Sequence, residues 1–393
     1  MSTLLRNRES SRLTSSTAIR MIVRFIRGGI DSMRHYSNRT VLKLRIKTLA
    51  FLTVVALLAA ACSSASSSGA SSGSSASSAK TYTVSVAYYP GALASLPAFV
   101  AADAGFFAQN HLKVNLVPID SGPAMTSSLV SGSVTFVNNS YDNLEEAISK
   151  GLSIRAVVGN TVEPAFQLVA RKGLSLPHLS DGYPNDLRDL MNKKWGVIAV
   201  GVSEQYIDEE MLAGAGLNPN GVTYVGVGLP STALPALLNG AVDTYLSIAP
   251  MTSILVDNHE GSVVVNLAAG QGPPDFRNVD YNGWWTTTNE ITSNPAAVRD
   301  FARANEQAYC FYRNPANLKK VTSIVSKYVK VPQLNSAQFE QMIKSNLPEF
   351  GVNINSASIA AWNHLLDSNH ILSKPYSRSA LVASTAPSSY SCP

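Results

Sequence analysis

Short apolar segments of strand character alternate with segments of helical character from Thr81 onward. β-Branched residues mark the strands, whereas apolar residues three and four positions apart mark the helices. The pattern predicts a strand at 83–87, a helix at 96–107, a strand at 114–119, a helix at 123–130, a strand at 134–137, a helix at 141–150 and a strand at 154–158. Such alternation with short links is typical of an α/β fold in which helices cover both faces of a mainly parallel sheet.

The same order of segments recurs 108 residues later in the chain. The strand at 114–119 is matched at 222–227, and the helix ends at Gly132 and Gly240 are each followed at once by a strand. Any α/β unit in which a glycine ends a helix could give part of this match. The constant offset across 22 positions nevertheless favours two structurally similar lobes.

Residues 1–61 have the pattern of an export signal. A basic cluster at 43–47 precedes a 14-residue apolar run, Thr48–Ala61, which ends in small residues before Cys62. The run is shorter than the roughly 20 apolar residues of a membrane-spanning helix. It resembles a bacterial lipoprotein signal, and this resemblance implies that Cys62 is lipidated and anchors the chain on the extracytoplasmic face of the cell membrane. An uncleaved membrane anchor is the alternative.

Met33 is a second candidate start, which would leave residues 1–32 untranslated. Residues 1–61 hold 11 of the 31 Lys and Arg but only 2 of the 26 Asp and Glu, so the processed chain has a net charge of −4. No basic stripe remains that would indicate a nucleic-acid partner. Residues 62–80 form a tether, because Ser63–Ala79 contains only Ser, Ala and Gly and cannot bury apolar surface.

Several segments resemble periplasmic binding proteins of the nitrate, sulfonate and thiamine-precursor type, in that family's order. The first is Pro97–Phe107, which ends in an alanine and a glycine followed by two phenylalanines. It is followed by segments at 121–125, 129–136, 150–154, 186–198, 237–250 and 294–301, so that the resemblance covers about residues 82–330. The resemblance implies a two-lobed clamp of type II, with residues 81–168 and 284–393 in one lobe and 169–283 in the other. Hinge strands would lie near Phe166–Arg171 and Trp284–Thr288.

The resemblance also implies a function: the solute-binding component of an ABC importer, a monomer that delivers a small ligand to a permease and its ATPase. Two alternatives stay open. A ligand-sensing lipoprotein adaptor would have the same sequence features, and thiamine-pyrimidine synthases of yeast share the fold family, although their cysteine-rich signature is missing here. The six histidines (His35, His111, His178, His259, His364 and His370) lack metal-ligand spacing to a second His or Cys, so we expect neither catalysis nor a cofactor.

Ligands of open α/β sheets bind beyond the carboxyl ends of the strands, where helix N-termini present free N–H groups. This rule selects the candidate ligand-binding residues Tyr88, Tyr89, Gly91, Ser121, Gly122, Asn138, Asn139, Ser140 and Tyr141 in the first lobe, Ser203, Gln205, Tyr206 and Ser247 in the second, and Trp284 on the return crossover. The three serines before helices could equally be ordinary N-caps. Trp284 and Trp285 alternate along a strand, so we expect one to face the core and the other the cleft.

These residues suggest a small organic anion or zwitterion of sulfonate, carboxylate or pyrimidine-precursor type. Aromatic walls suit an apolar or planar part, and the helix starts at Ser121 and Ser203 suit an acidic group. The candidate loops carry no Lys or Arg, which argues against bare inorganic anions. Cys310 and Cys392 are the only other cysteines in a chain expected to reach an oxidising compartment, and we expect a disulfide between them.

Overall fold

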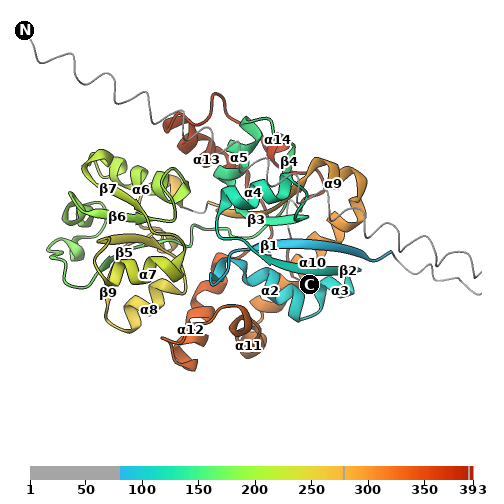
Figure 1. Cartoon of the computed structure of the whole chain (residues 1–393), viewed down its shortest axis with the longest axis horizontal. Helices are drawn as coiled ribbons and strands as arrows, with labels where there is room; N and C mark the ends of the chain where they lie inside the picture. The colour runs from blue at the N-terminus through green and yellow to red at the C-terminus, as the bar shows by residue number, and fades with distance from the viewer. Residues whose placement is uncertain (1–79, 278, 388–389, 393) are drawn as a thin grey trace, which may run out of the picture. The chain divides into compact units, whose positions relative to one another are not determined.

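The computed structural model describes residues 80–277, 279–387 and 390–392 (Figure 1). The predicted signal, the lipidation site Cys62 and all but the last residue of the predicted tether lie outside these residues. The strands form two five-stranded sheets, of order β2-β1-β3-β10-β4 and β7-β6-β8-β5-β9. Figure 1 shows these two sheets as separate groups of strands, each with its own helices.

Four strands of the first sheet are parallel and one is antiparallel. The parallel strands are β1 (Tyr82–Tyr88), β2 (Leu112–Pro118), β3 (Phe136–Ser140) and β4 (Ile154–Gly159). The antiparallel strand is β10 (Asn282–Thr287), which pairs with β3 on one side and with β4 on the other. The predicted strand at 134–137 is therefore displaced towards its carboxyl end, because β10 pairs with Asn138, Asn139 and Ser140.

The second sheet repeats this arrangement. Its parallel strands are β6 (Lys194–Val197), β7 (Thr223–Gly226), β8 (Thr244–Ser247) and β9 (Gly261–Asn266), and β5 (Gln167–Arg171) is the antiparallel strand between β8 and β9. In each sheet the inserted strand follows a crossing from the other sheet. The predicted α/β fold of two similar, mainly parallel lobes is confirmed, and the match at an offset of 108 residues reflects the shared topology.

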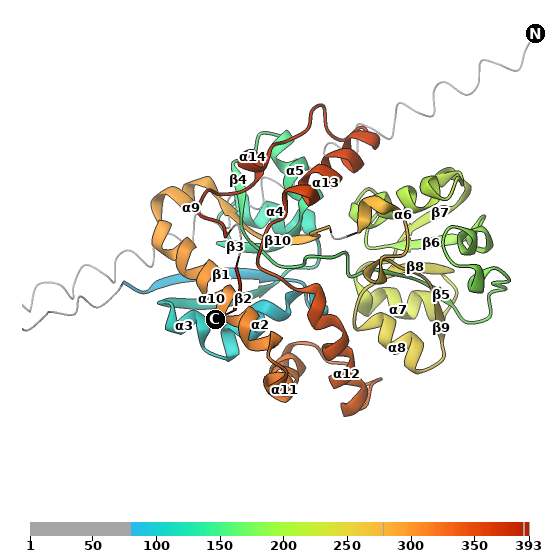
Figure 2. The ribbon, with the colours of Figure 1, turned by 180° about the vertical axis from the view of Figure 1, so that it is seen from behind.

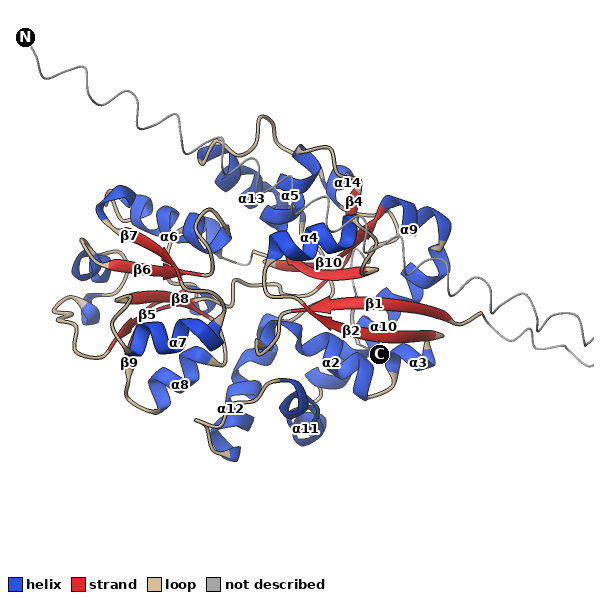
Figure 3. Ribbon diagram, viewed as in Figure 1, coloured by secondary structure: helices blue, strands red, loops and turns tan. Residues whose placement is uncertain are grey.

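Helices cover the faces of both sheets (Figures 2 and 3). In both views, α6 lies beside β6 and β7, whereas α7 and α8 lie beside β5 and β9. The α-helices are α2 (Leu96–Asp103), α3 (Phe106–Gln109), α4 (Gly122–Val130), α5 (Tyr141–Ser149), α6 (Ser203–Gly214), α7 (Pro230–Leu238), α8 (Met251–Asp257), α9 (Thr288–Ser293), α10 (Pro295–Arg313), α11 (Leu318–Tyr328), α12 (Ser336–Asn346), α13 (Ser356–Ser368) and α14 (Arg378–Leu381). The single helix predicted at 96–107 is divided into α2 and α3, because Gly105 has a φ of +84°.

Both tryptophans of β10 are buried. Trp284 and Trp285 point to opposite faces of the strand, as their alternation requires, and pack in two different apolar clusters. Trp284 packs against Phe301 of α10, with ring centroids 5.6 Å apart. Each indole is 0% exposed, because β10 is an inner strand with covered faces. The expectation that one of the pair faces the cleft is therefore wrong.

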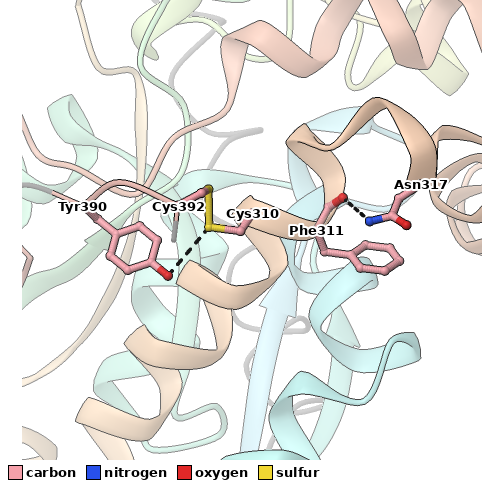
Figure 4. The surroundings of a disulfide bond; sticks show 5 residues. All are labelled: Cys310, Phe311, Asn317, Tyr390 and Cys392. Atoms are coloured by element: carbon pink, nitrogen blue, oxygen red, sulfur yellow. Dashed lines mark hydrogen bonds between the residues drawn. A yellow bond between two sulfur atoms is a disulfide. The ribbon is translucent and has the colours of Figure 1, made fainter.

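The C-terminal segment is linked covalently to α10 (Figure 4). A disulfide joins Cys310 to Cys392, whose Cα atoms are 5.3 Å apart. The hydroxyl of Tyr390 points to the Sγ atom of Cys310 at 3.7 Å. Disulfides of this kind persist in oxidising compartments. Within the part of the chain that the structure describes, none of the helices combines the length and apolarity that a membrane span requires.

Candidate functional site

A pocket lies where residues that follow the strands of both sheets come together. Its lining includes Tyr89 after β1, Ser121 after β2, Thr161 after β4, Ile198 after β6, Leu229 after β7 and Ile248 after β8. The crossing segments contribute Phe166 and Tyr281, and the C-terminal part contributes Asn346, Glu349 and Phe350. The unfilled space between these residues, counted together with open solvent at the mouth, is about 780 Å³.

The two crossings of the chain are hydrogen-bonded to each other beside this pocket. The backbone amides of Asn160 and Thr161 both donate to the carbonyl of Asn282, at 3.1 Å. The Asn282 amide in turn donates to Thr161 Oγ1 at 2.8 Å. Thr161 and Asn282 also line the pocket, so the segments that connect the lobes form part of its wall.

Five of the predicted ligand-binding residues line the pocket: Tyr89, Ser121, Gly122, Ser140 and Ser203. The lining does not include Tyr88, Gly91, Asn138, Asn139, Tyr141, Gln205, Tyr206, Ser247 or Trp284. Trp284 and Tyr141 are 0% exposed, so neither ring forms the expected aromatic wall. The aromatic rings that do line the pocket are those of Tyr89, Phe166, Tyr281 and Phe350.

Asn138 and Asn139 are buried supports of the pocket because they belong to β3 itself and not to a loop after it. Asn139 Nδ2 donates to the Gly122 carbonyl at 2.9 Å, and its Oδ1 accepts from the Tyr89 hydroxyl at 3.1 Å. Asn138 Nδ2 donates to the Ala94 carbonyl at 3.0 Å. A Cβ atom on Gly122 would lie 2.7 Å from Asn139 Oδ1, so the position favours glycine.

The other predicted residues outside the lining have local structural contacts. The ring of Tyr88 packs edge-on against Phe99, with centroids 5.2 Å apart, and Gly91 adopts a φ of +70° in a turn. The side chains of Gln205 and Tyr206 both bond the backbone of Gly201, at 2.9 Å. Ser247 Oγ accepts from the hydroxyl of Thr252 at 2.9 Å.

The three serines at helix starts differ in what their hydroxyls bind. Ser121 Oγ accepts from the amide of Ala124 at 3.4 Å and caps α4. Ser140 Oγ accepts from Asn143 Nδ2 at 2.8 Å without capping α5 through its side chain. Ser203 Oγ lies 2.9 Å from the hydroxyl of Tyr281. Capping by the side chain is thus observed only for Ser121 among these three described serines.

Two carboxyl groups that sequence reasoning missed line the pocket. Glu204, in the first turn of α6, is 5% exposed, and its Oε1 accepts from the Tyr281 hydroxyl at 3.3 Å. Burial raises the pKa of Glu204 to about 7, and the charge of nearby Asp142 adds to the rise. Glu349 is 8% exposed, and burial, followed by the charge of Glu163, raises its pKa to about 8. Burial also raises the pKa of Asp142, at the start of α5, to about 6.

The lining therefore has carboxyl groups that can ionise but no basic side chain among its described residues. Among the described residues that line the pocket there are two carboxyls and no Lys, Arg or His. Glu204 lies in the first turn of α6, so an anion bound at that helix start would lie beside another acid. Within the described part of the chain, no group of three or more His, Cys, Asp and Glu side chains is arranged to hold a metal ion.

Residues 93–317 match the sequence profile of the family described as NMT1/THI5 like. The chain belongs to the NMT1/THI5-like family. The comparison with curated protein sequences gave no match. Glu349 lies beyond the matched residues, so the family resemblance could not have identified it.

Solved structures similar to this NMT1/THI5-like protein include ligand-binding proteins of import systems. The alkanesulfonate-binding protein SsuA from Xanthomonas axonopodis pv. citri bound to MOPS has a TM-score of 0.61 and 18% identity, covering 77% of this chain and 99% of that one. The ligand-binding component of an ABC-type import system from Staphylococcus aureus with zinc bound has a TM-score of 0.62 and 15% identity, covering 79% and 100%. The nitrate-binding protein NrtA from Synechocystis PCC 6803 has a TM-score of 0.57 and 13% identity, covering 75% and 83%. At these identities the likeness establishes the fold, which is the two-lobed clamp predicted from the sequence.

Proposed function

We propose that this chain is the extracytoplasmic solute-binding component of an ABC importer and binds a small organic molecule without transforming it. The observation that carries the proposal is the pocket itself, because its lining combines residues of both sheets with residues of both crossings. A ligand that contacts both lobes stabilises the arrangement in which these contacts are made, by its differential affinity. That arrangement is what a permease with its ATPase would recognise.

The lining supports an organic ligand over a bare inorganic ion. Leu93, Ile198 and Phe350 give it apolar walls, and polar atoms are few. The sequence suggests a ligand of sulfonate, carboxylate or pyrimidine-precursor type. Among these, amino-substituted pyrimidines and the sulfonates or carboxylates that also have an amino group fit this lining best. A pure anion would lie beside Glu204 with no cationic side chain among the described lining residues, and desolvation would make that arrangement costly.

We expect the natural ligand to copurify with the protein and to be lost when Ala94→Trp fills the pocket with an indole. Ligand at 100 times its dissociation constant should stabilise the wild type by about 2.7 kcal/mol. Mass spectrometry of the denatured protein identifies the molecule, and thermal melting of the ligand-free proteins checks that the variant is folded. Recovery of the same molecule, at the same occupancy, from the folded Ala94→Trp variant would contradict the proposal.

We further propose that the mature chain is a monomer anchored to the membrane by a lipid on Cys62. The signal pattern supports the anchor, and the disulfide between Cys310 and Cys392 supports export to an oxidising compartment. Cys62→Ser should abolish lipid labelling, whereas Ser63→Ala should leave it intact. Lipid labelling is followed together with membrane fractionation, and continued labelling of the Cys62→Ser protein would refute the anchor.

A further inference from the structure

We infer that the pocket recognises its ligand by an organic cationic group and holds this ammonium or amidinium group at Glu204, with Glu349 as a second acceptor in the same lining. The inference rests on the proposed function and names the chemistry of its ligand. Both side chains are more than nine-tenths buried and both line the pocket.

The titratable groups that interact electrostatically with Glu204 in the described part of the chain are acids and phenols, and none of them is basic. Asp142 of α5 faces it from the first lobe, and Asp208 lies one turn further along α6. Tyr89, Tyr245 and Tyr281 are the phenols, and burial raises the pKa of each, so all three are neutral donors. A positive group supplied by the ligand would therefore be the counter-charge of this carboxyl.

Glu349 provides the second observation. No hydrogen bond from the described residues reaches its carboxyl oxygens, and the charged group beside it is another acid, Glu163. A carboxyl that is 8% exposed, lines a cavity and has no hydrogen-bond donor among the described residues can accept a hydrogen bond from a ligand. The donors of an ammonium or amidinium group match the ionised form of Glu349, whereas a sulfonate or carboxylate has only acceptors and could bond its protonated form alone.

An organic cation suits this pocket better than a metal ion. The described residues include no three-ligand group of His, Cys, Asp and Glu, and apolar side chains such as Leu93 and Ile198 form much of the lining. An apolar or aromatic body can cover these side chains while its charged end meets Glu204. Tyr89 and Tyr281 lie in the same lining and present rings over which a cation is also favoured.

The pH dependence of the affinity should have opposite signs for a cationic and an anionic ligand. In the empty pocket burial raises the pKa of Glu204 to about 7, so the carboxyl is largely protonated at pH 5.5 and largely ionised at pH 8. A cation binds the ionised form, so its affinity must rise between these two pH values. An anion binds beside the protonated form, so its affinity must fall over the same interval.

The experiment compares butylamine, benzylamine and benzamidine with butanesulfonate, benzenesulfonate and benzoate, and includes benzamide as a neutral analogue. Titration calorimetry on the purified protein at pH 5.5 and pH 8 measures affinity and proton release. Glu204→Gln and Glu349→Gln remove the two carboxyls with little change of shape. Glu210→Gln is the matched control, because it makes the same charge change on α6 outside the pocket lining.

We expect a cationic probe to bind at least tenfold more tightly than its anionic and neutral counterparts, and at least tenfold more tightly at pH 8 than at pH 5.5. Glu204→Gln should weaken this binding tenfold or more at pH 8 and remove most of its pH dependence, and Glu349→Gln should weaken it to a smaller extent. Glu210→Gln should behave as the wild type does.

The inference is overturned if an anionic probe binds the wild type more tightly than its cationic counterpart, or binds Glu204→Gln more tightly than the wild type. If this binding of the anionic probe is lost in Ala94→Trp, the proposed solute-binding function nevertheless stands. If no probe of the panel binds in a manner that depends on Ala94, the inference fails, and the copurification experiment decides separately on the proposed function.

Discussion

Replacing Cys310 by serine should lower the free energy of unfolding by about 4 kcal/mol. The disulfide joins residues 82 positions apart, and in the unfolded chain such a cross-link removes much of the loop-closure entropy. In the folded chain it holds the C-terminal segment against α10, whose Ala304 and Ala308 are buried in the apolar core. The loss should therefore appear as a lower denaturation midpoint for the whole domain and not as local fraying alone.

Denaturant unfolding without reductant measures this change. Cys392→Ser and the double variant should lose the same free energy of unfolding as Cys310→Ser, because all three proteins lack the same disulfide. Added reductant should bring the wild type close to them. Two free thiols in the denatured, unreduced protein, counted in a Cys62→Ser background, would show that the bond is not formed.

Stability should fall as the pH rises from 5 to 9. Several buried carboxyls have pKa values raised by burial: Asp142 and Asp280 to about 6, Glu204 to about 7, Glu349 to about 8 and Glu145 to about 9. In the unfolded chain such groups titrate near pH 4. Because the folded-state pKa values are higher, the stability from these groups is complete below pH 4 and is lost as the pH rises through the folded values.

Glu145→Gln isolates the largest of these pKa shifts. Glu145 of α5 is 0% exposed, and neither carboxyl oxygen has a hydrogen-bond partner among the described residues. Replacing the acid by its amide should abolish up to about 4 kcal/mol of the destabilisation that the wild type undergoes between pH 5 and pH 8. The measurement is denaturant unfolding of both proteins at the two pH values.

Glu146→Gln is the control for this pair of measurements. Glu146 is the neighbouring residue, but its side chain is 39% exposed and pairs with Lys150 on the surface at 2.6 Å. Its replacement should change the free energy of unfolding by less than about 1 kcal/mol at either pH. Equal pH dependence of Glu145→Gln and the wild type would show that Glu145 does not titrate as inferred.

The sequence by itself determined the architecture, because strand and helix periods are local properties of the chain. The alternation from Thr81 predicted the parallel strands, and the offset between Gly132 and Gly240 predicted two similar sheets. The positions of the strand ends in the sequence also predicted part of the pocket wall, because residues that follow parallel strands meet at one edge of a sheet. Tyr89, Ser121 and Ser203 were found in this way, and all three line the pocket.

The tertiary structure decided which residues near these positions are exposed to the pocket. Asn138 and Asn139 appeared to follow a strand, but β10 pairs with them from more than 140 residues away and extends β3 to Ser140. No local pattern contains that pairing. The alternation of Trp284 and Trp285 was visible in the sequence, whereas the burial of both depends on the helices and strands that cover β10.

The charge of the pocket was also decided by the tertiary structure alone. Asp142, Glu204 and Glu349 belong to three separate elements, and each resembles an ordinary surface acid in the sequence. Folding buries all three, and Glu204 and Glu349 line one cavity without a basic side chain among its described residues. Burial and proximity are properties of the folded chain, so the acidic character of the site could be inferred only after the lobes were in place.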